Sequence, residues 1–322
     1  IVVNDLAMET LKNNYVRSGR PMTENNLKQA NMPENAQVLP NDQGTAPGFW
    51  LEKNDKIIVS LPGPPREMTN MFTKEVLPRL KKKQDSVINY RILRTFGLGE
   101  SKMETVLLPL IDGQTDPTIA TYAKEGECSL RIASKRPTYE EAAKAVDDMT
   151  DKVMDIIGEY VYSKDNEELI DVVGKLLLSK GITVSCAESC TGGLFSGAIT
   201  SIPGISDIFD RGIVTYSNKA KVEELGVSLD TLEKFGAVSA ETAEEMVLGL
   251  ELKTGSDLCV SITGISGPGG GSEEKPVGLF YIGIRWQGKT DVIKVRSRNV
   301  NRKWNRNYAV LNMLYEVYRR IS

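Results

Sequence analysis

The stretch CAESCTGG, residues 186–193, combines a serine, two cysteines, a carboxylate and a Gly-Gly pair. An apolar run precedes it, which is typical of a strand that turns into a helix. Glycines let a ligand approach the backbone, and the N–H groups at a helix N-terminus can stabilise an oxyanion. Ser189 is therefore either a nucleophile that attacks a carbonyl group or, with Thr191, a cap for the helix. In the first case the N–H groups of Thr191, Gly192 and Gly193 would hold the oxyanion.

The 322 residues include no histidine, which limits how a serine can be activated. A Ser-His-Asp triad and a Cys-His dyad are both excluded, so another base must take the proton. Tyr216 and Lys221, in the stretch VTYSNKAK, are the remaining candidates. A surface lysine is normally a solvated charge, but a buried lysine loses its proton more readily and can then act as a base. We therefore expect Lys221 to accept the serine proton, either directly or through Tyr216.

A glycine-rich loop follows a third predicted strand, in the stretch SITGISGPGGGSEEKPVG. Its three consecutive glycines either approach a phosphate or a planar ring or form a flexible hairpin loop. A Walker loop is excluded because the Gly-Lys-Ser/Thr ending is missing. Arg302 and Arg306 lie four residues apart on one helix face, where they either clamp a phosphate or stay solvated.

Other reactive side chains near Ser189 have less specific interpretations. Glu188 either orients Lys221 or pairs elsewhere. Cys186 and Cys190 have no histidine nearby, so we interpret them as small buried hydrophobic residues rather than metal ligands. The four cysteines are spread along the chain and predict no disulfide framework, which is typical of a reducing cytoplasm.

The composition is that of a globular protein with two or three domains. The net charge of −3 shows no basic excess of the kind that marks a nucleic-acid surface. No apolar stretch is long enough to span a membrane.

Three regions are expected, over residues 1–84, 85–163 and 164–322. In the first, the pattern predicts a helix over 6–19, a turn-rich passage over 32–49, a strand over 56–63 and a helix over 64–80. In the second, a small α+β unit, it predicts strands over 88–97 and 127–135 and helices over 99–111 and 138–158.

The third region alternates helices with strands, which predicts an α/β layered domain. Helices are expected over 166–181, 191–202, 218–225, 239–255 and 301–321, with Gly181 as a C-cap and Ser239 as an N-cap. Strands are expected over 182–188, 211–217 and 257–264, followed by a hairpin over 277–298.

Several stretches of residues 164–322 occur together in one order: TVSCAESCTGG, RGIVTYSNKAK, GAVSAETAEEM, SITGISGPGGGSEEKPVG and the arginine helix. This region resembles the C-terminal domain of the CinA family, the competence/damage-inducible proteins. The resemblance implies an amidase that converts nicotinamide mononucleotide to nicotinate mononucleotide and ammonia, in pyridine-nucleotide salvage, without a cofactor or metal.

The same resemblance implies roles for single residues. Ser189 would be the nucleophile, with Tyr216 and Lys221 as its activating pair. The implied substrate-binding residues are Thr191, Gly192, Gly193, Ser206 in the pocket, Thr263 beside the amide, Gly264, Gly269, Gly270, and Arg302 at the phosphate. The family commonly has Gly-Asp before this arginine, whereas this chain has Val300 and Asn301, which puts the role of Arg302 in doubt.

The upstream regions resemble the rest of a CinA protein. The stretches NNLKQANMPENAQVLPNDQGTAPGF and IIVSLPGPPREM are similar to the second half of a molybdopterin-binding-like α/β domain, so we expect its first half to be missing. GLGESKMETVL and DPTIATYAKEGECSLRIASK are similar to a KH-like domain. The family also implies a homodimer in the cytoplasm.

Two alternative functions remain open. The resemblance implies that an intact first domain would hydrolyse nucleotide pyrophosphates such as ADP-ribose with a divalent metal. A non-enzymatic KH-type nucleic-acid adaptor is disfavoured, because residues 85–163 contain no G-x-x-G sequence.

Overall fold

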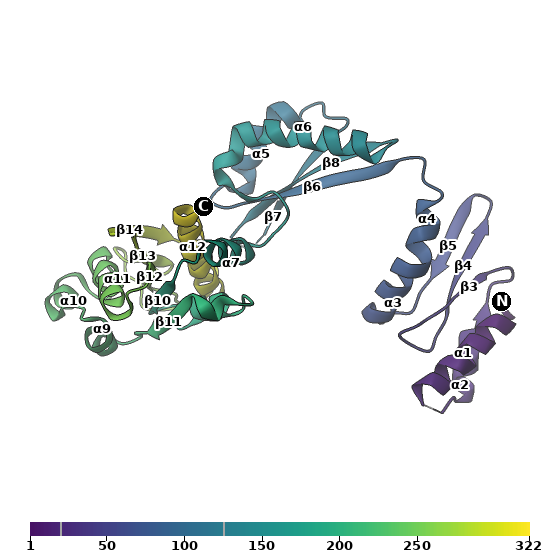
Figure 1. Cartoon of the computed structure of the whole chain (residues 1–322), viewed down its shortest axis with the longest axis horizontal. Coiled ribbons are helices and arrows are strands. Elements are labelled where there is room, and N and C mark those ends of the chain that lie inside the picture. Colours follow the sequence, from purple (N-terminus) through teal and green to yellow (C-terminus); the bar gives the residue numbers. More distant parts are fainter. Residues whose placement is uncertain (20, 125) are drawn as a thin grey trace. The chain divides into compact units, whose positions relative to one another are not determined.

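The structure is a computed structural model that describes residues 1–19, 21–124 and 126–322. It is mixed α/β and multidomain, as the sequence predicts (Figure 1). The chain divides into two compact units, residues 1–87 and 88–322. Among the described residues, no helix is both long and apolar enough to cross a bilayer.

The first unit is built on a three-stranded antiparallel sheet of β3 (Gln37–Leu39), β4 (Gly48–Lys53) and β5 (Lys56–Ser60). Alternate residues of β4 point to opposite faces. On one face Phe49 and Leu51 pack with Ala7 of α1 (Asp5–Ser18). On the other, Trp50 packs with Met71 of α3 (Pro65–Met71), which continues through a π turn into α4 (Leu77–Lys81). The unit also contains α2 (Glu24–Leu27) and the short pair β1 (Val2–Val3) and β2 (Asn31–Met32).

The expectation of a turn-rich passage over 32–49 is wrong in part. This passage contains β3 and the start of β4. The proline- and asparagine-rich composition does not predict this short strand. It forms because cross-strand pairing with β4 outweighs the local propensity of these residues.

Residues 87–163 form a four-stranded sheet in the order β7-β8-β6-β9. The strands are β6 (Val87–Thr95), β7 (Thr118–Ala123), β8 (Cys128–Arg136) and β9 (Val161–Ser163). Two helices, α5 (Glu100–Ile111) and α6 (Tyr139–Ile157), pack against it, with Met103 and Val146 in the shared core. The predicted helices are confirmed, whereas β7 and β9 were not predicted.

The C-terminal region is built on a five-stranded sheet in the order β11-β10-β12-β13-β14. Its strands are β10 (Val184–Glu188), β11 (Phe209–Val214), β12 (Leu258–Gly264), β13 (Leu279–Trp286) and β14 (Lys289–Arg296). The first three are parallel, and β13 and β14 form the predicted antiparallel hairpin.

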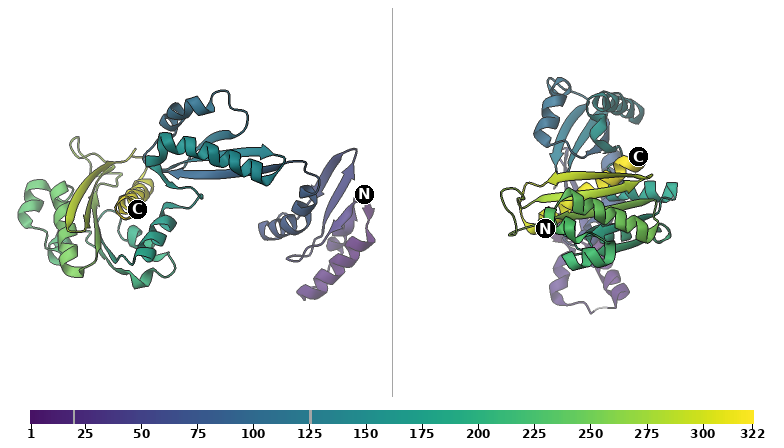
Figure 2. Two further views of the ribbon diagram at one scale, coloured as in Figure 1. Left: turned by 45° about the horizontal axis from the view of Figure 1, so that its top comes forward. Right: turned by 90° about the vertical axis from the view of Figure 1, so that its left-hand side faces the viewer.

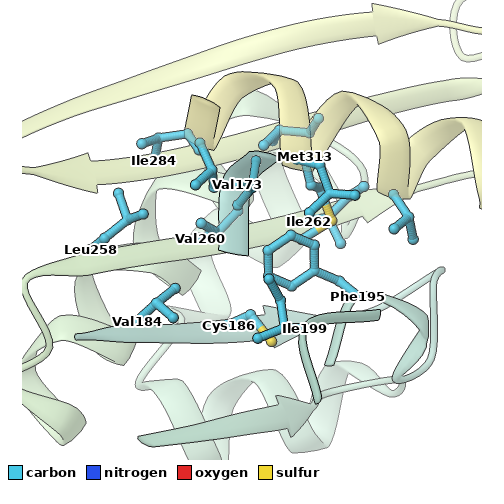
Figure 3. Close-up of a cluster of buried hydrophobic side chains, with 14 of the residues drawn as sticks. Val173, Val184, Cys186, Phe195, Ile199, Leu258, Val260, Ile262, Ile284 and Met313 are labelled. Atoms are coloured by element: carbon cyan, nitrogen blue, oxygen red, sulfur yellow. The ribbon is translucent and has the colours of Figure 1, made fainter. Parts of the chain in front are cut away.

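Helices cover both faces of this sheet (Figures 1 and 2). On one face lie α7 (Leu169–Lys180), α8 (Leu194–Thr200) and α12 (Arg302–Ile321). On the other lie α9 (Asn218–Leu225), α10 (Leu229–Phe235) and α11 (Ala240–Thr254). Figure 3 shows the first of these cores, in which Phe195 packs with Cys186 and Ile262. The predicted caps are confirmed, since Gly181 has φ +61° and the Ser239 hydroxyl accepts from Thr242 N.

The carboxyl ends of parallel strands lie side by side, so this topology brings the candidate site residues that follow β10, β11 and β12 close together. Glu188 at the end of β10 lies between Val214 of β11 and Ile262 of β12. Two predicted boundaries differ from the structure. β11 ends at Val214, so Tyr216 lies in the turn before α9, and α8 begins only at Leu194, so residues 191–193 form a turn.

Candidate active site

Ser189 and Lys221 are hydrogen-bonded at the carboxyl edge of the parallel strands. The Lys221 Nζ donates to Ser189 Oγ at 3.0 Å and to the carbonyl of Thr215 at 2.8 Å. Both side chains are buried, with 8% of Ser189 and 1% of Lys221 exposed. Burial lowers the pKa of Lys221, because the ammonium loses its hydration. A neutral lysine at this distance can accept the serine proton.

The strands hold both members of this pair in place. Ser189 N donates to the carbonyl of Ile262 at 3.1 Å, and Thr215 N donates to the carbonyl of Glu188 at 2.8 Å. Lys221 sits in the first turn of α9, which Ser217 caps by accepting from Ala220 N. The serine is thus tied to β12 and the lysine to the end of β11, on either side of β10.

The Glu188 carboxylate closes the turn that carries Ser189. It is fully buried and accepts from the N–H groups of Gly193, Phe195 and Ser196 at 2.8–3.1 Å, as well as from the Ser196 hydroxyl. It therefore caps α8, whose own N-cap residue is Gly193. Of the two roles left open for Glu188, the structure supports pairing elsewhere and not orientation of Lys221.

This cap corrects the expected oxyanion site at Thr191–Gly193. The Gly193 N–H is bound to Glu188, and the Gly192 N–H donates to the carbonyl of Ser189 at 3.1 Å. The carboxylate also offsets the positive end of the helix dipole. The N–H groups of Cys190 and Thr191 directly follow the serine, and within the described residues they donate to no backbone carbonyl.

Arg306 holds the same turn from the side of α12. Its Nε donates to the carbonyl of Cys190 at 3.1 Å and its Nη2 to that of Thr191 at 2.6 Å. This arginine was expected either to clamp a phosphate or to be solvated, and in the structure it is half-buried and bound to these two carbonyls. The neighbouring Asn305 is fully buried and donates to the carbonyl of Ser266 at 3.0 Å, which fixes the glycine-rich loop to α12.

Three buried hydroxyl groups lie on the segments around the pair. They belong to Thr191, Thr215 and Ser266, and none has a hydrogen-bond partner among the described residues. Buried hydroxyls are nearly always hydrogen-bonded, so such a group marks a place for a polar ligand or water. All three occur where β10, β11 and β12 lead into their loops.

Tyr216 and Arg302 form a separate, exposed pair. The Tyr216 side chain is 62% exposed, and its hydroxyl accepts from Arg302 Nη2 at 3.0 Å. Arg302 Nη1 donates to the carbonyl of Gly267 at 2.7 Å. The expected activating trio is thus divided, with Ser189 and Lys221 inside and Tyr216 bound to Arg302. Asn301 caps α12 by accepting from Trp304 N.

The remaining expected substrate-binding residues lie in and beside the glycine-rich loop. The Thr263 hydroxyl donates to the carbonyl of Ala237 at 2.5 Å, so it anchors the loop before α11. A Cβ on Gly264 would lie 2.3 Å from the Phe280 ring, which requires glycine there. Gly269 has open space around it, and Gly270 has φ +84°. The loop borders a cavity of about 410 Å³.

Ser206 does not reach this site within one chain, which corrects the expected pocket role. It is exposed, in a short 3₁₀ helix immediately before β11. β11 runs parallel to β10, so its start lies at the opposite edge of the sheet from Ser189. The length of β11, about 17 Å at roughly 3.3 Å per residue, separates the two edges.

The cysteines behave as small buried residues, as predicted. All four are free and buried, and burial raises the pKa of the Cys190 thiol to about 12. Within the described part of the chain, no three His, Cys, Asp or Glu side chains gather to hold a metal ion.

Sequence reasoning missed the roles of Glu188, Asn305 and Arg306. One signal was available for Glu188. The turn before α8 lacks a Ser, Thr, Asp or Asn at the N-cap position, so another acceptor must satisfy its N–H groups. Nothing in the spacing of Asn305 or Arg306 distinguishes a backbone clamp from a ligand contact.

Comparisons with known proteins find relatives of this chain. Residues 166–321 match the family model of the CinA C-terminal domain, and residues 90–163 match that of the damage-inducible protein CinA KH domain. A competence-damage inducible protein of Clostridium acetobutylicum is 47% identical over 95% of this chain and 74% of its own length. One from Acetivibrio thermocellus is 45% identical over 97% of this chain and 75% of its own length. The crystal structure of a competence/damage inducible protein from Agrobacterium tumefaciens is 40% identical, covers 47% of this chain and 94% of its own, and has a TM-score of 0.45.

Proposed function

The chain belongs to the CinA family, and we propose that residues 164–322 hydrolyse the carboxamide of nicotinamide mononucleotide. One observation carries the proposal. A buried lysine and a buried serine are hydrogen-bonded at the end of a parallel strand in a chain without histidine. We infer that this pair serves as a nucleophile and its base.

The first half of the proposed reaction forms an ester. Neutral Lys221 takes the proton of the Ser189 hydroxyl while Oγ attacks the carboxamide carbon. In this proposal the N–H groups of Cys190 and Thr191 bind the oxyanion, and losing one such donor typically costs about 2.7–4 kcal/mol. The C–N bond then breaks, the Lys221 ammonium protonates the departing nitrogen, and ammonia leaves.

The second half hydrolyses the ester. Lys221, neutral again, takes a proton from water, and the hydroxide attacks the acyl carbon. The C–O bond to Ser189 breaks, and Lys221 returns the proton to Oγ. Nicotinate mononucleotide leaves, and no metal or cofactor takes part in either half.

Arg302 is the proposed contact of the substrate phosphate. Its side chain is exposed, and its guanidinium donates to the Gly267 carbonyl in the glycine-rich loop and to the Tyr216 hydroxyl. A guanidinium binds phosphate through paired hydrogen bonds. Tyr216 then serves as an orienting residue for Arg302 rather than as the base.

The test is ammonia release from nicotinamide mononucleotide by the full chain, with nicotinamide riboside as the matched substrate without phosphate. We expect ammonia and nicotinate mononucleotide in equal amounts, and slower turnover of the riboside. No ammonia from either compound would refute the amidase.

Two other activities are tested with the same preparation. ADP-ribose with a divalent metal tests the pyrophosphatase alternative. Salt-dependent retention of RNA tests a role for the KH domain as a nucleic-acid adaptor. We also propose a cytoplasmic location, which the four free cysteines support.

A further inference from the structure

The turn after β10 has its peptide carbonyl groups occupied and two of its N–H groups left over. The carbonyl of Ser189 accepts from Gly192 N at 3.1 Å. The next two carbonyls, those of Cys190 and Thr191, both accept from the Arg306 guanidinium. The N–H groups of Cys190 and Thr191 remain, since within the described residues they donate to no backbone carbonyl.

The peptide group between Cys190 and Thr191 links the arginine to the proposed oxyanion site. It is planar and trans, so its C=O and N–H bonds point in opposite directions. Arg306 Nε, on α12, binds the carbonyl of this peptide at 3.1 Å. Because the guanidinium fixes the carbonyl on the side of α12, the Thr191 N–H is aimed at the opposite side of the turn.

The same contact should make this N–H group a stronger donor. A hydrogen bond from a charged group is stronger than one between neutral groups, and hydrogen bonds in a chain polarise one another through the amide that they share. Arg306 is half-buried, so solvent screens its charge less than it would at the surface. Two of its nitrogens face carbonyl oxygens, so the charge is directed at the turn.

Gly192 leaves room for the guanidinium. A Cβ at this position would lie 3.2 Å from Arg306 Nη2, and the residue has φ +57°. The close approach and the left-handed backbone both favour glycine. Gly192 was expected to bind substrate, and the structure adds that its lack of a side chain lets Arg306 approach the turn.

We propose that Arg306 is a positioning residue of the amidase, which orients and polarises the N–H groups that bind the oxyanion. The inference rests on the proposed amide hydrolysis. Negative charge develops on the carboxamide oxygen as the serine attacks, and donors that are already aimed at it lower the barrier most. Arg306 thus acts on the acyl group, which nicotinamide mononucleotide and nicotinamide riboside share. A phosphate clamp, the role that the sequence left open for Arg306, acts on the mononucleotide alone.

The kinetics of Arg306→Met with both substrates separate these two roles. We expect kcat for ammonia release to fall about 10- to 100-fold, by the same factor for the mononucleotide and the riboside, with KM changed less than about threefold. Arg306→Lys keeps the charge but loses the fork of two donors, so its kcat should lie between those of the wild type and Arg306→Met. Arg319→Met, at an exposed position later in α12, is the matched control and should keep full activity. A loss confined to the mononucleotide, or an unchanged kcat, would overturn the inference.

A serine-directed probe tests the same turn without the proposed substrate. With a fluorophosphonate, Ser189 Oγ forms a bond to phosphorus, fluoride leaves, Lys221 takes the serine proton, and the phosphoryl oxygen occupies the oxyanion site. Arg306→Met and Gly192→Ala should both be labelled at least about tenfold more slowly than the wild type, while an unchanged circular dichroism spectrum excludes unfolding as the cause.

The two experiments together distinguish the failures. If the wild type releases no ammonia while its labelling still depends on Arg306, the amidase fails and the role of Arg306 at the oxyanion site stands. Equal labelling of the wild type and Arg306→Met would overturn that role. A wild type that is not labelled at all would remove the reactive serine, and both proposals with it.

Discussion

Residues 164–322 bury ionisable side chains, whereas the charged side chains described in residues 1–87 are not buried. In the C-terminal region Glu188 and Lys221 are at most 1% exposed and sit at strand ends beside hydroxyls that lack partners. In the first unit the ion pairs are exposed, as in Lys74–Asp42, where about half of each side chain is accessible. A buried ionisable group costs stability unless it is paired. Glu188 is satisfied by the N–H groups of α8 and so has a structural role, whereas Lys221, which is hydrogen-bonded to Ser189, marks chemistry.

Removing the nucleophile should have the largest effect. Ser189→Ala deletes one hydroxyl, and we expect ammonia release to fall by about 10⁴-fold or more. Circular dichroism and thermal unfolding should be nearly unchanged, because the substitution fits the same space. Ser201→Ala, at an exposed position after α8, is the control. Substantial turnover by the alanine variant would remove the serine from the mechanism.

Removing the buried base should be nearly as severe and should also change the pH dependence of stability. Lys221→Met should lower ammonia release by about 10³-fold or more. Burial lowers the pKa of Lys221 in the folded state, so the unfolded chain binds more protons between that pKa and about 10.4. The free energy of unfolding of the wild type, relative to the variant, should therefore rise with pH over this window.

Urea titrations of both proteins across alkaline pH measure that difference. A constant gap between the two curves would mean that the lysine titrates normally. In the wild type, kcat/KM for ammonia release should rise with pH as the lysine loses its proton. A flat profile would exclude a lysine base.

The positions of Ser189 and Lys221 could be predicted from the sequence in part. The strand and turn at residues 182–193 follow from an apolar run before Gly-Gly, and the Ser189–Lys221 contact follows from the missing histidine. The division of Tyr216 from Lys221 did not follow, because one residue of strand length decides which way a side chain points. Ser206 was named a pocket residue by resemblance alone, and within one chain the direction of β11 puts it at the other end of the strands from Ser189.

The cap on α8 should matter for stability more than for chemistry. Glu188→Ala leaves several buried N–H groups without an acceptor and should lower the free energy of unfolding by about 3–5 kcal/mol. Glu188→Gln keeps an acceptor oxygen and should lose about half as much. Denaturant unfolding compares the two, and equal stability of both with the wild type would contradict the cap.

Arg302 should affect recognition of the substrate phosphate. Arg302→Lys keeps the charge but loses the paired geometry, so KM for the mononucleotide should rise about tenfold with kcat little changed. The riboside, which has no phosphate, is the control and should react equally with both proteins. An equal rise in KM for the riboside would mean that Arg302 only supports the glycine-rich loop and Tyr216.

The smallest effect is expected in the first unit. Lys74→Ala breaks its exposed ion pair with Asp42 and should change the free energy of unfolding by less than about 1 kcal/mol. Ammonia release should stay at the wild-type level. A larger loss of stability would show that the two regions differ less than their burial indicates.

The turn at residues 189–193 should be unusually rigid for a loop. It has no regular structure, yet Glu188 and Arg306 hold it from two sides. Loops usually open on their own and exchange their amide protons quickly. Here the amides of Gly193 and Phe195 should take up deuterium as slowly as those at the centre of β10, so the serine would be presented by a segment as rigid as the sheet.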